Sequence, residues 1–179
     1  MKLLRAVLCI FVIMLVSGCS HYPDISGKVI DNATGKPIEG AIVVAQWTKA
    51  RGLLGEQQRE LQKITETVTD KDGKFSLSGT MGFVLHPHEM IIYKEGYIPW
   101  RNDQIFPNSD KVKDHAWKDN VTYKLDIFTD KYTAVQLRDF MDSAIIGYGN
   151  VPTYHKIYNE ISDKARNEIE AKKAKQQKQ

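Results

Sequence analysis

Residues 85 to 90 read Leu-His-Pro-His-Glu-Met and place two histidines beside a glutamate. His86 and Glu89 have the H-x-x-E spacing that some zinc peptidases use. His86 and His88 are two positions apart, so on a β-strand they would point to the same side and could bind one metal ion together. A catalytic zinc needs three protein ligands and an open position. The third ligand would come from another part of the chain: an acidic residue, His21, His115 or His155.

Pro87 argues against this site, because proline inside a strand favours an edge or a loop. The long α/β domain that surrounds the H-x-x-E motif of zinc carboxypeptidases has no counterpart in this sequence. Three interpretations stay open for His86 and His88: a metal-dependent hydrolase, metal binding without catalysis, and polar side chains on a strand edge. The last is favoured, and no metal site is predicted.

Other reactive motifs are incomplete. Residues 70–73, Asp-Lys-Asp-Gly, begin like a calcium-binding EF-hand loop, but the twelfth position is Met81 where that loop needs a glutamate. The sequence contains no G-x-S-x-G, no P-loop and no G-x-G-x-x-G, since residues 147–149 lack the third glycine. We therefore predict no catalytic residue and no cofactor.

The N-terminus has the pattern of a secretory signal. Lys2 and Arg5 give a positive start, and residues 6–16 are an unbroken apolar run before Val-Ser-Gly-Cys at 16–19. The apolar run is shorter than the ~20 residues of a membrane-spanning helix. Val-Ser-Gly-Cys resembles the lipobox of bacterial lipoproteins. The alternative is a plain secretory signal that happens to contain a cysteine.

The lipobox resemblance implies that residues 1–18 are a signal peptide and that Cys19 becomes the acylated first residue. Each buried methylene contributes about 0.8 kcal/mol, so one acyl chain binds a membrane weakly while two or more bind it stably. In Gram-negative lipoproteins a residue other than aspartate after the cysteine, here Ser20, implies export to the outer membrane.

Length, cysteine content and net charge limit the possible functions further. The chain has 179 residues, which suits one domain with appendages. Its two cysteines are Cys9, inside the signal, and Cys19, so the processed chain has no thiol for a disulfide, a nucleophile or a metal ligand. The net charge is only +3, and we predict no nucleic-acid partner.

Short strands separated by turn residues predict a mainly β domain, an antiparallel sandwich of about seven strands over residues 25–128. The expected strands lie at 26–31, 41–47, 64–69, 74–79, 83–97 (best defined at 90–93) and 121–128. Residues 70–73 are predicted as the turn of a hairpin between two of them. Residues 48–63 are polar, contain two glycines and read as a loop or a loop with one or two helical turns. The predicted turn residues are Gly35, Pro37, Gly40, Asp70, Gly73 and Gly96.

Beyond residue 128 the apolar spacing becomes helical. Residues 129–147 predict a helix with a Thr133–Gln136 capping box and a stop at Gly147. A second helix is expected from Pro152, with an apolar stripe that packs on the sandwich or docks another protein. The lysine-rich residues 171–179 are expected to be frayed. The stripe comprises Tyr154, Ile157, Tyr158, Ile161 and Ala165, prolonged by Ile169.

Three segments, at 26–45, 67–79 and 91–99, resemble the carboxypeptidase regulatory-like domain, a transthyretin-like β-sandwich. The resemblance rests on G-x-V-x-D at 27–31, G-x-P-I-x-G-A at 35–41, T-D-x-x-G-x-F at 69–75 and the late pair Gly96-Tyr97. It covers about residues 24–128 and implies a non-catalytic accessory, binding or spacer module. Nothing carries over to residues 48–63, 101–120 or the helices.

These observations predict a signal peptide at 1–18, a lipidated tether at 19–24, a sandwich at 25–128 and a helical extension at 129–179. The expected function is a non-catalytic, lipid-anchored envelope protein that binds, spaces or assembles other components. One alternative is a metal-dependent hydrolase that uses His86 and His88. Another is an accessory subunit that docks on an unidentified envelope protein through its C-terminal helices.

Overall fold

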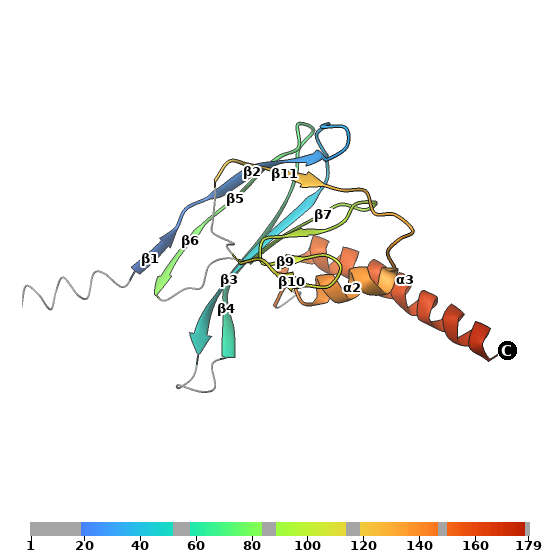
Figure 1. The fold of residues 1–179 in the computed structure, drawn as a ribbon. Helices are drawn as coiled ribbons and strands as arrows, with labels where there is room; N and C mark the ends of the chain where they lie inside the picture. The colour runs from blue at the N-terminus through green and yellow to red at the C-terminus, as the bar shows by residue number, and fades with distance from the viewer. Residues whose placement is uncertain (1–18, 52–57, 84–88, 114–118, 147–149, 178–179) are drawn as a thin grey trace, which may run out of the picture.

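We analysed a computed structural model that describes residues 19–51, 58–83, 89–113, 119–146 and 150–177. Two facing sheets with seven strands in all form a sandwich (Figure 1). The first sheet has the order β11 (Val121–Leu125), β2 (Ile25–Asp31), β5 (Lys74–Leu77). The second has the order β4 (Gln58–Val68), β3 (Ile42–Arg51), β7 (Glu89–Tyr93), β8 (Trp100–Arg101). The predicted mainly β sandwich with a helical extension is confirmed.

The core between the two sheets contains the alternate residues of their inner faces. Val29 and Leu125 of the first sheet are buried in one cluster with Val43, Trp47 and Ile92 of the second. Most strand pairs are antiparallel, but β11 runs parallel to β2, with Tyr123 opposite Val29. An all-antiparallel sandwich was therefore wrong for this pair. A parallel partner needs a long connection rather than a helix as such, and the chain between β2 and β11 supplies that length.

The turn at 70–73 forms as predicted, but it is not a hairpin within one sheet. Asp70 Oδ1 accepts the backbone N–H groups of Asp72 (2.9 Å) and Lys74 (2.8 Å). The strand before the turn, β4, pairs with β3, whereas the strand after it, β5, pairs with β2. The turn therefore carries the chain from one sheet to the other.

The prediction of a loop at 48–63 was also wrong. β3 continues to Arg51 and β4 begins at Gln58, and their pairing extends to the Arg51–Gln58 pair. A register shift between Trp47 and Thr48 marks a β-bulge where this hairpin leaves the body of the sandwich. Figure 1 shows the hairpin projecting from the sheet. Cross-strand pairing overrides the weak local signal of these polar residues.

Four of the predicted turn residues, Gly35, Gly40, Gly73 and Gly96, have φ between 68° and 85°, where glycine is favoured. Gly73 is the most constrained, because a Cβ there would lie 2.4 Å from the Val29 carbonyl oxygen. Pro37 lies opposite Ile30 in an isolated bridge.

Asp31 and Tyr97, from two separate motifs of the resemblance, meet across the sandwich. The Tyr97 hydroxyl donates to Asp31 Oδ2 at 3.0 Å, and the Thr34 amide donates to Asp31 Oδ1 at 2.7 Å. The Thr34 amide is the main cause of a lowered Asp31 pKa, and the Thr34 and Tyr97 hydroxyl groups lower that pKa further. In β11, Tyr123 and Leu125 are buried, but the strand ends at Leu125 rather than at the expected residue 128, and Ile127 beyond it is 54% exposed.

Residues 101–113, where no strand was predicted, contain the short pair β9 (Gln104–Ile105) and β10 (Asp110–Lys111). The capping box of α2 (Ala134–Asp142) is confirmed. The backbone N–H of Gln136 donates to Thr133 Oγ1, and the backbone N–H of Thr133 donates to Gln136 Oε1. The helix ends at Asp142 with Ser143 as its C-cap, before the expected stop at Gly147, which lies outside the described residues.

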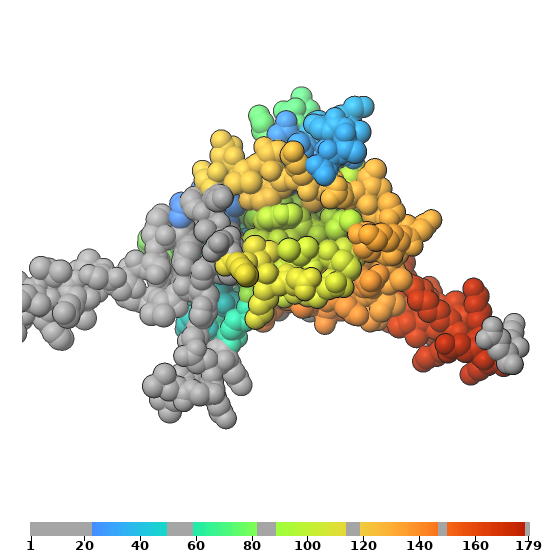
Figure 2. Space-filling model, viewed as in Figure 1, coloured from blue at the N-terminus to red at the C-terminus, as the bar shows by residue number. Residues whose placement is uncertain are grey.

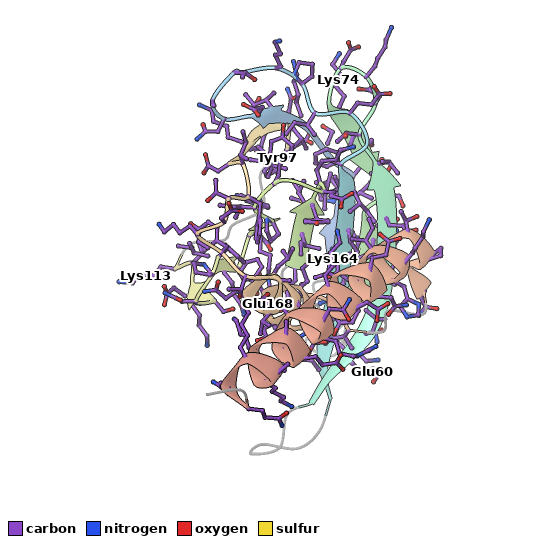
Figure 3. All side chains as sticks on the ribbon, turned by 90° about the vertical axis from the view of Figure 1, so that its right-hand side faces the viewer. Glu60, Lys74, Tyr97, Lys113, Lys164 and Glu168 are labelled. Atoms are coloured by element: carbon purple, nitrogen blue, oxygen red, sulfur yellow. The ribbon has the colours of Figure 1, made fainter. Side chains whose placement is uncertain are left out.

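The two helices cover the outer face of the four-stranded sheet, and Figure 3 shows α3 (Pro152–Gln176) crossing in front of it. Outward residues of that sheet form a second core with α2 and α3, so the stripe of α3 is a core face, the first of its two expected uses. β3 has Ile42 and Val44 on this side and Val43 and Ala45 on the other, which explains why the strand is buried from Ile42 to Thr48. The expected fraying from residue 171 was wrong, since α3 continues to Gln176. No helix among the described residues is long and apolar enough to cross a membrane.

Candidate functional site

The strand that begins at Cys19 belongs to a β-ribbon outside the two main sheets. β1 (Cys19–Tyr22) pairs antiparallel with β6 (Thr80–Phe83), with Cys19 opposite Phe83 and Tyr22 opposite Thr80. Figure 1 shows this ribbon leaving the sandwich on the side opposite to the C-terminal end of α3. The segment expected to be a tether, 19–24, is therefore mostly a paired strand.

The base of the ribbon is fixed to the sandwich. Asp24 Oδ1 accepts the Gly79 N–H at 2.9 Å, and the next residue, Ile25, is only 1% exposed in the core. Lys63, from the long hairpin, donates its Nζ to the Ser78 carbonyl oxygen at 2.9 Å and also contacts the Gly79 carbonyl oxygen. Cys19 and Ile25 are six positions apart in the sequence, which corresponds to a rise of about 20 Å in extended chain. The geometry holds Cys19 at a set distance and direction from the core.

The candidate metal ligands His86 and His88 lie outside the described residues, as does His115. His155 is exposed on α3. Among the residues that the structure describes, no group of three His, Cys, Asp or Glu side chains is placed to hold a metal ion. The metal hypothesis for the two histidines therefore stays an untested alternative.

Glu89, the glutamate of the H-x-x-E spacing, is placed in β7 and has structural partners. Its Oε2 accepts the Gln46 side-chain amide at 2.6 Å, and its Oε1 pairs with Arg59 of the long hairpin. Gln46 is buried, and it also donates to the Ala144 carbonyl oxygen and accepts the Ile146 N–H. This glutamate thus contributes to a network that joins β3, β4, β7 and the end of α2.

A surface groove of about 340 Å³ lies between the end of β7 and α3. It contains two acidic and two basic side chains, and Lys164 Nζ contacts Glu95 Oε1 at 2.9 Å. The Lys164 hydrogen bond is the main cause of a lowered Glu95 pKa. Burial, reinforced by nearby carboxylates, raises the pKa of Tyr93 to about 12, so its phenol stays neutral and can act only as a hydrogen-bonding group at ordinary pH. The groove is lined by Gly40, Tyr93, Lys94, Glu95, Ile157, Glu160, Ile161 and Lys164.

The chemistry of this groove is that of a polar binding surface. Lys164 pairs with Glu95, and neither a cysteine nor a serine nor a histidine is among the residues that line the groove. Two large aromatic residues serve the core and not a groove. Trp47 is fully buried in the sandwich core, and the Trp100 ring packs edge-on against the Tyr123 ring with 4.7 Å between the ring centroids.

Sequence reasoning located the turn residues but missed the ribbon and the groove. β1 has only four residues and no alternating apolar pattern, so its pairing with β6 left no local signal. The groove joins residues 40, 93–95 and 157–164, which only the packing of α3 brings together.

Comparisons with known proteins give little guidance. No protein-family model matches the chain, and no curated protein matches it. A solved structure described as a Streptococcal ancillary pilin aligns with a TM-score of 0.33 and 15% identity, over 59% of this chain and 29% of the pilin chain. At that level the alignment carries no argument about fold or function.

Proposed function

We propose that this chain is a non-catalytic, lipid-anchored protein of the bacterial cell envelope, acylated at Cys19, in which the sandwich and helices act as a binding, spacer or assembly module. The observation that carries the proposal is the position of the lipobox cysteine at the start of a strand whose pairing leads directly into the core. With Ser20 next in sequence, the expected site in a Gram-negative host is the outer membrane.

The geometry of the ribbon supports a spacer role. A flexible linker lets an anchored domain explore all directions, whereas a paired strand fixes one. The hydrogen bond from Gly79 to Asp24 and the contacts of Lys63 with the Ser78 and Gly79 carbonyl oxygens hold the base of the ribbon to the sandwich. A non-catalytic role is further supported by the hydrogen bonds that occupy the carboxylate of Glu89.

Acylation is tested by growing bacteria that produce the full chain with an alkyne fatty acid, followed by click labelling and mass spectrometry of the N-terminal peptide. The wild-type chain should carry label on Cys19, and Cys19→Ser should abolish it. Cys9→Ser is the matched control, because it removes the only other cysteine and should leave the label unchanged. Unlabelled wild-type protein, or label that survives Cys19→Ser, would refute the proposal.

A second candidate role is docking of an envelope partner on the free end of α3. The last described contacts of this helix with α2 include the Ala134 N–H donating to Glu168 Oε2 at 3.0 Å. Figure 2 shows the C-terminal end of the helix projecting beyond the body, and its side chains from Glu170 to Gln176 are exposed.

Truncation after Ala171 tests this role. The buried helix residues Tyr154, Ile161 and Ala165 remain in place, so the fold should be retained. The truncated chain should lose the neighbours that full-length protein cross-links in native membranes. An unchanged cross-linking pattern would rule out docking through this end. Deleting both helices would be a poor test, because it would remove half of the second core.

A further inference from the structure

The groove between the end of β7 and α3 contains a buried polar group that the protein itself does not pair. Tyr93 is only 5% exposed, and its ring belongs to the second core. Within the described residues its hydroxyl forms no hydrogen bond, but this oxygen is not sealed off from solvent, so it opens into the groove that Tyr93 lines. A neutral phenol can donate one hydrogen bond and accept another. Buried polar groups are rarely left unpaired, so this hydroxyl is available to a ligand.

Two of the four charged side chains around the phenol are also available. Lys164 of α3, labelled in Figure 3, pairs with Glu95. In the part of the chain that the structure describes, the Lys94 ammonium and the Glu160 carboxylate form no hydrogen bond or ion pair. The groove therefore offers a ligand one positive and one negative group that its own described residues leave unpaired.

These two charges come from different elements. Lys94 follows β7, and its Nζ lies against Gly40, where an added Cβ would be only 2.9 Å away. Glycine at position 40, with φ of 71°, thus leaves room for the ammonium group. Glu160 comes from α3 on the other side of the groove. Burial is the main cause of the raised Tyr93 pKa, and the charges of Glu95 and Glu160 raise it further, which indicates that both carboxylates lie near the phenol.

We propose that this groove binds a small zwitterion, a molecule with one ammonium group and one carboxylate, such as a free amino acid or a short peptide. The ammonium group donates to Glu160 and to the Tyr93 hydroxyl oxygen, and the carboxylate accepts from Lys94 Nζ. The groove volume of about 340 Å³ lies within the ~300–1,000 Å³ typical of small-molecule sites. The inference deepens the binding role in the proposed function and rests on that role, but it does not depend on acylation.

A ligand with a single charge fits the groove less well. An anion would leave the Glu160 carboxylate unpaired beside it, and a cation would leave the Lys94 ammonium unpaired, whereas a zwitterion pairs both. Ile157 and Ile161 of α3 add apolar surface to the lining, on which the carbon skeleton of the ligand packs.

The test is a titration of the full chain, purified in detergent micelles, followed by saturation-transfer NMR of the ligand. The probes are leucine, as a free amino acid, and alanyl-alanine, which has its two charges at the ends of a peptide. Each probe is compared with its N-acetylated form and with its C-terminal amide, which lack one charge each. At least one zwitterion should bind saturably, and either block should raise its Kd about tenfold. Tighter binding of leucine assigns the site to free amino acids, and tighter binding of alanyl-alanine assigns it to peptides.

Three variants connect this binding to the groove. Tyr93→Phe removes the hydroxyl and keeps the buried ring, while Lys94→Gln and Glu160→Gln each remove one charge. Each should raise the Kd of the bound zwitterion about three- to tenfold. Lys156→Gln and Glu170→Gln are the matched controls, because both side chains are exposed on α3 outside the groove, and they should leave the Kd unchanged.

The inference would be overturned if neither zwitterion binds saturably or if a blocked form binds as tightly as its zwitterion. It would also be overturned if the groove variants bind like their controls. Glu160→Gln keeps this last comparison decisive even if Tyr93→Phe disturbs the core, since Glu160 is exposed. Acyl label on Cys19 in protein that binds no zwitterion would overturn the ligand and leave the proposed anchor intact.

Discussion

A buried arginine at the end of β8 offers a sharp test of what joins the helices to the sandwich. The Arg101 side chain is only 2% exposed and pairs through two nitrogens with Asp103, at 2.9 and 2.7 Å. It also donates to the Phe140 carbonyl oxygen at 2.9 Å and to Ser143 Oγ at 2.7 Å, and its guanidinium lies 5.2 Å from the Phe140 ring centroid. Arg101 thus satisfies carbonyl groups at the C-terminal end of α2, which helices leave without internal partners.

The substitution Arg101→Met keeps the length of the side chain but removes every donor. Removing one partner of a buried ion pair costs about 3–5 kcal/mol, because the remaining charge stays desolvated. Asp103 is 17% exposed, so water recovers part of this cost, and we expect a loss near the lower limit, about 3 kcal/mol. For a chain of this size the melting temperature should fall by about 6–12 °C.

The assay is urea unfolding of a soluble form that starts at residue 20, followed by circular dichroism. Arg138→Met is the matched control, since Arg138 lies on α2 in an exposed pair with Asp139, and such pairs contribute about 0–1 kcal/mol. A double-mutant cycle with Asp103→Asn should give a coupling of about 1–3 kcal/mol. A loss below about 1 kcal/mol for Arg101→Met, or one equal to that of Arg138→Met, would refute the assignment of Arg101 as the main polar link.

Three further predictions concern a helix end, a turn and pH. Glu66→Ala should cost about 1–2 kcal/mol in urea unfolding, because Glu66 accepts two amides in the first turn of α3 and that helix has no side-chain cap of its own. Gly73→Ala should destabilise more than Gly35→Ala: both have positive φ, costing about 1–2 kcal/mol, but only at position 73 does the added Cβ meet a backbone oxygen. Equal losses would contradict the packing argument. The pKa of Asp31 is lower in the folded chain than in the unfolded chain. Its carboxylate therefore stabilises the fold at pH above the unfolded-state pKa, and this stabilisation is lost as the pH falls through the folded-state pKa. Asp31→Asn should therefore flatten the decline of the urea midpoint below about pH 4.

Features set by local chemistry could be predicted from the sequence. The capping box needs only Thr133 and Gln136, three residues apart, and the structure shows both of its hydrogen bonds. The turn at 70–73 follows from an aspartate that accepts backbone amides and a glycine with positive φ. Each of these signals lies within one turn of chain.

Features set by distant pairing could not be predicted. Residues 48–51 and 58–63 are polar, and they form strands because they pair with each other and include the Lys49–Glu60 contact at 3.7 Å. β4 and β5 belong to different sheets although only the turn at 70–73 separates them in the sequence. β2 pairs with a parallel strand, β11, about 90 residues later in the chain. Glu66 caps a helix that begins 86 residues later, and no spacing rule in the sequence relates two such positions.

The same distant pairing connects the proposed anchor to the helices. The hairpin that β3 and β4 form supplies Lys63 to the base of the ribbon, Glu66 to the start of α3, and Arg59 to Glu89. The base of the ribbon and the start of α3 therefore both contact one element, β4. These contacts restrict rotation of the ribbon and of α3 about the sandwich. On the proposed acylation of Cys19, they support a module held at a fixed height and angle above the membrane.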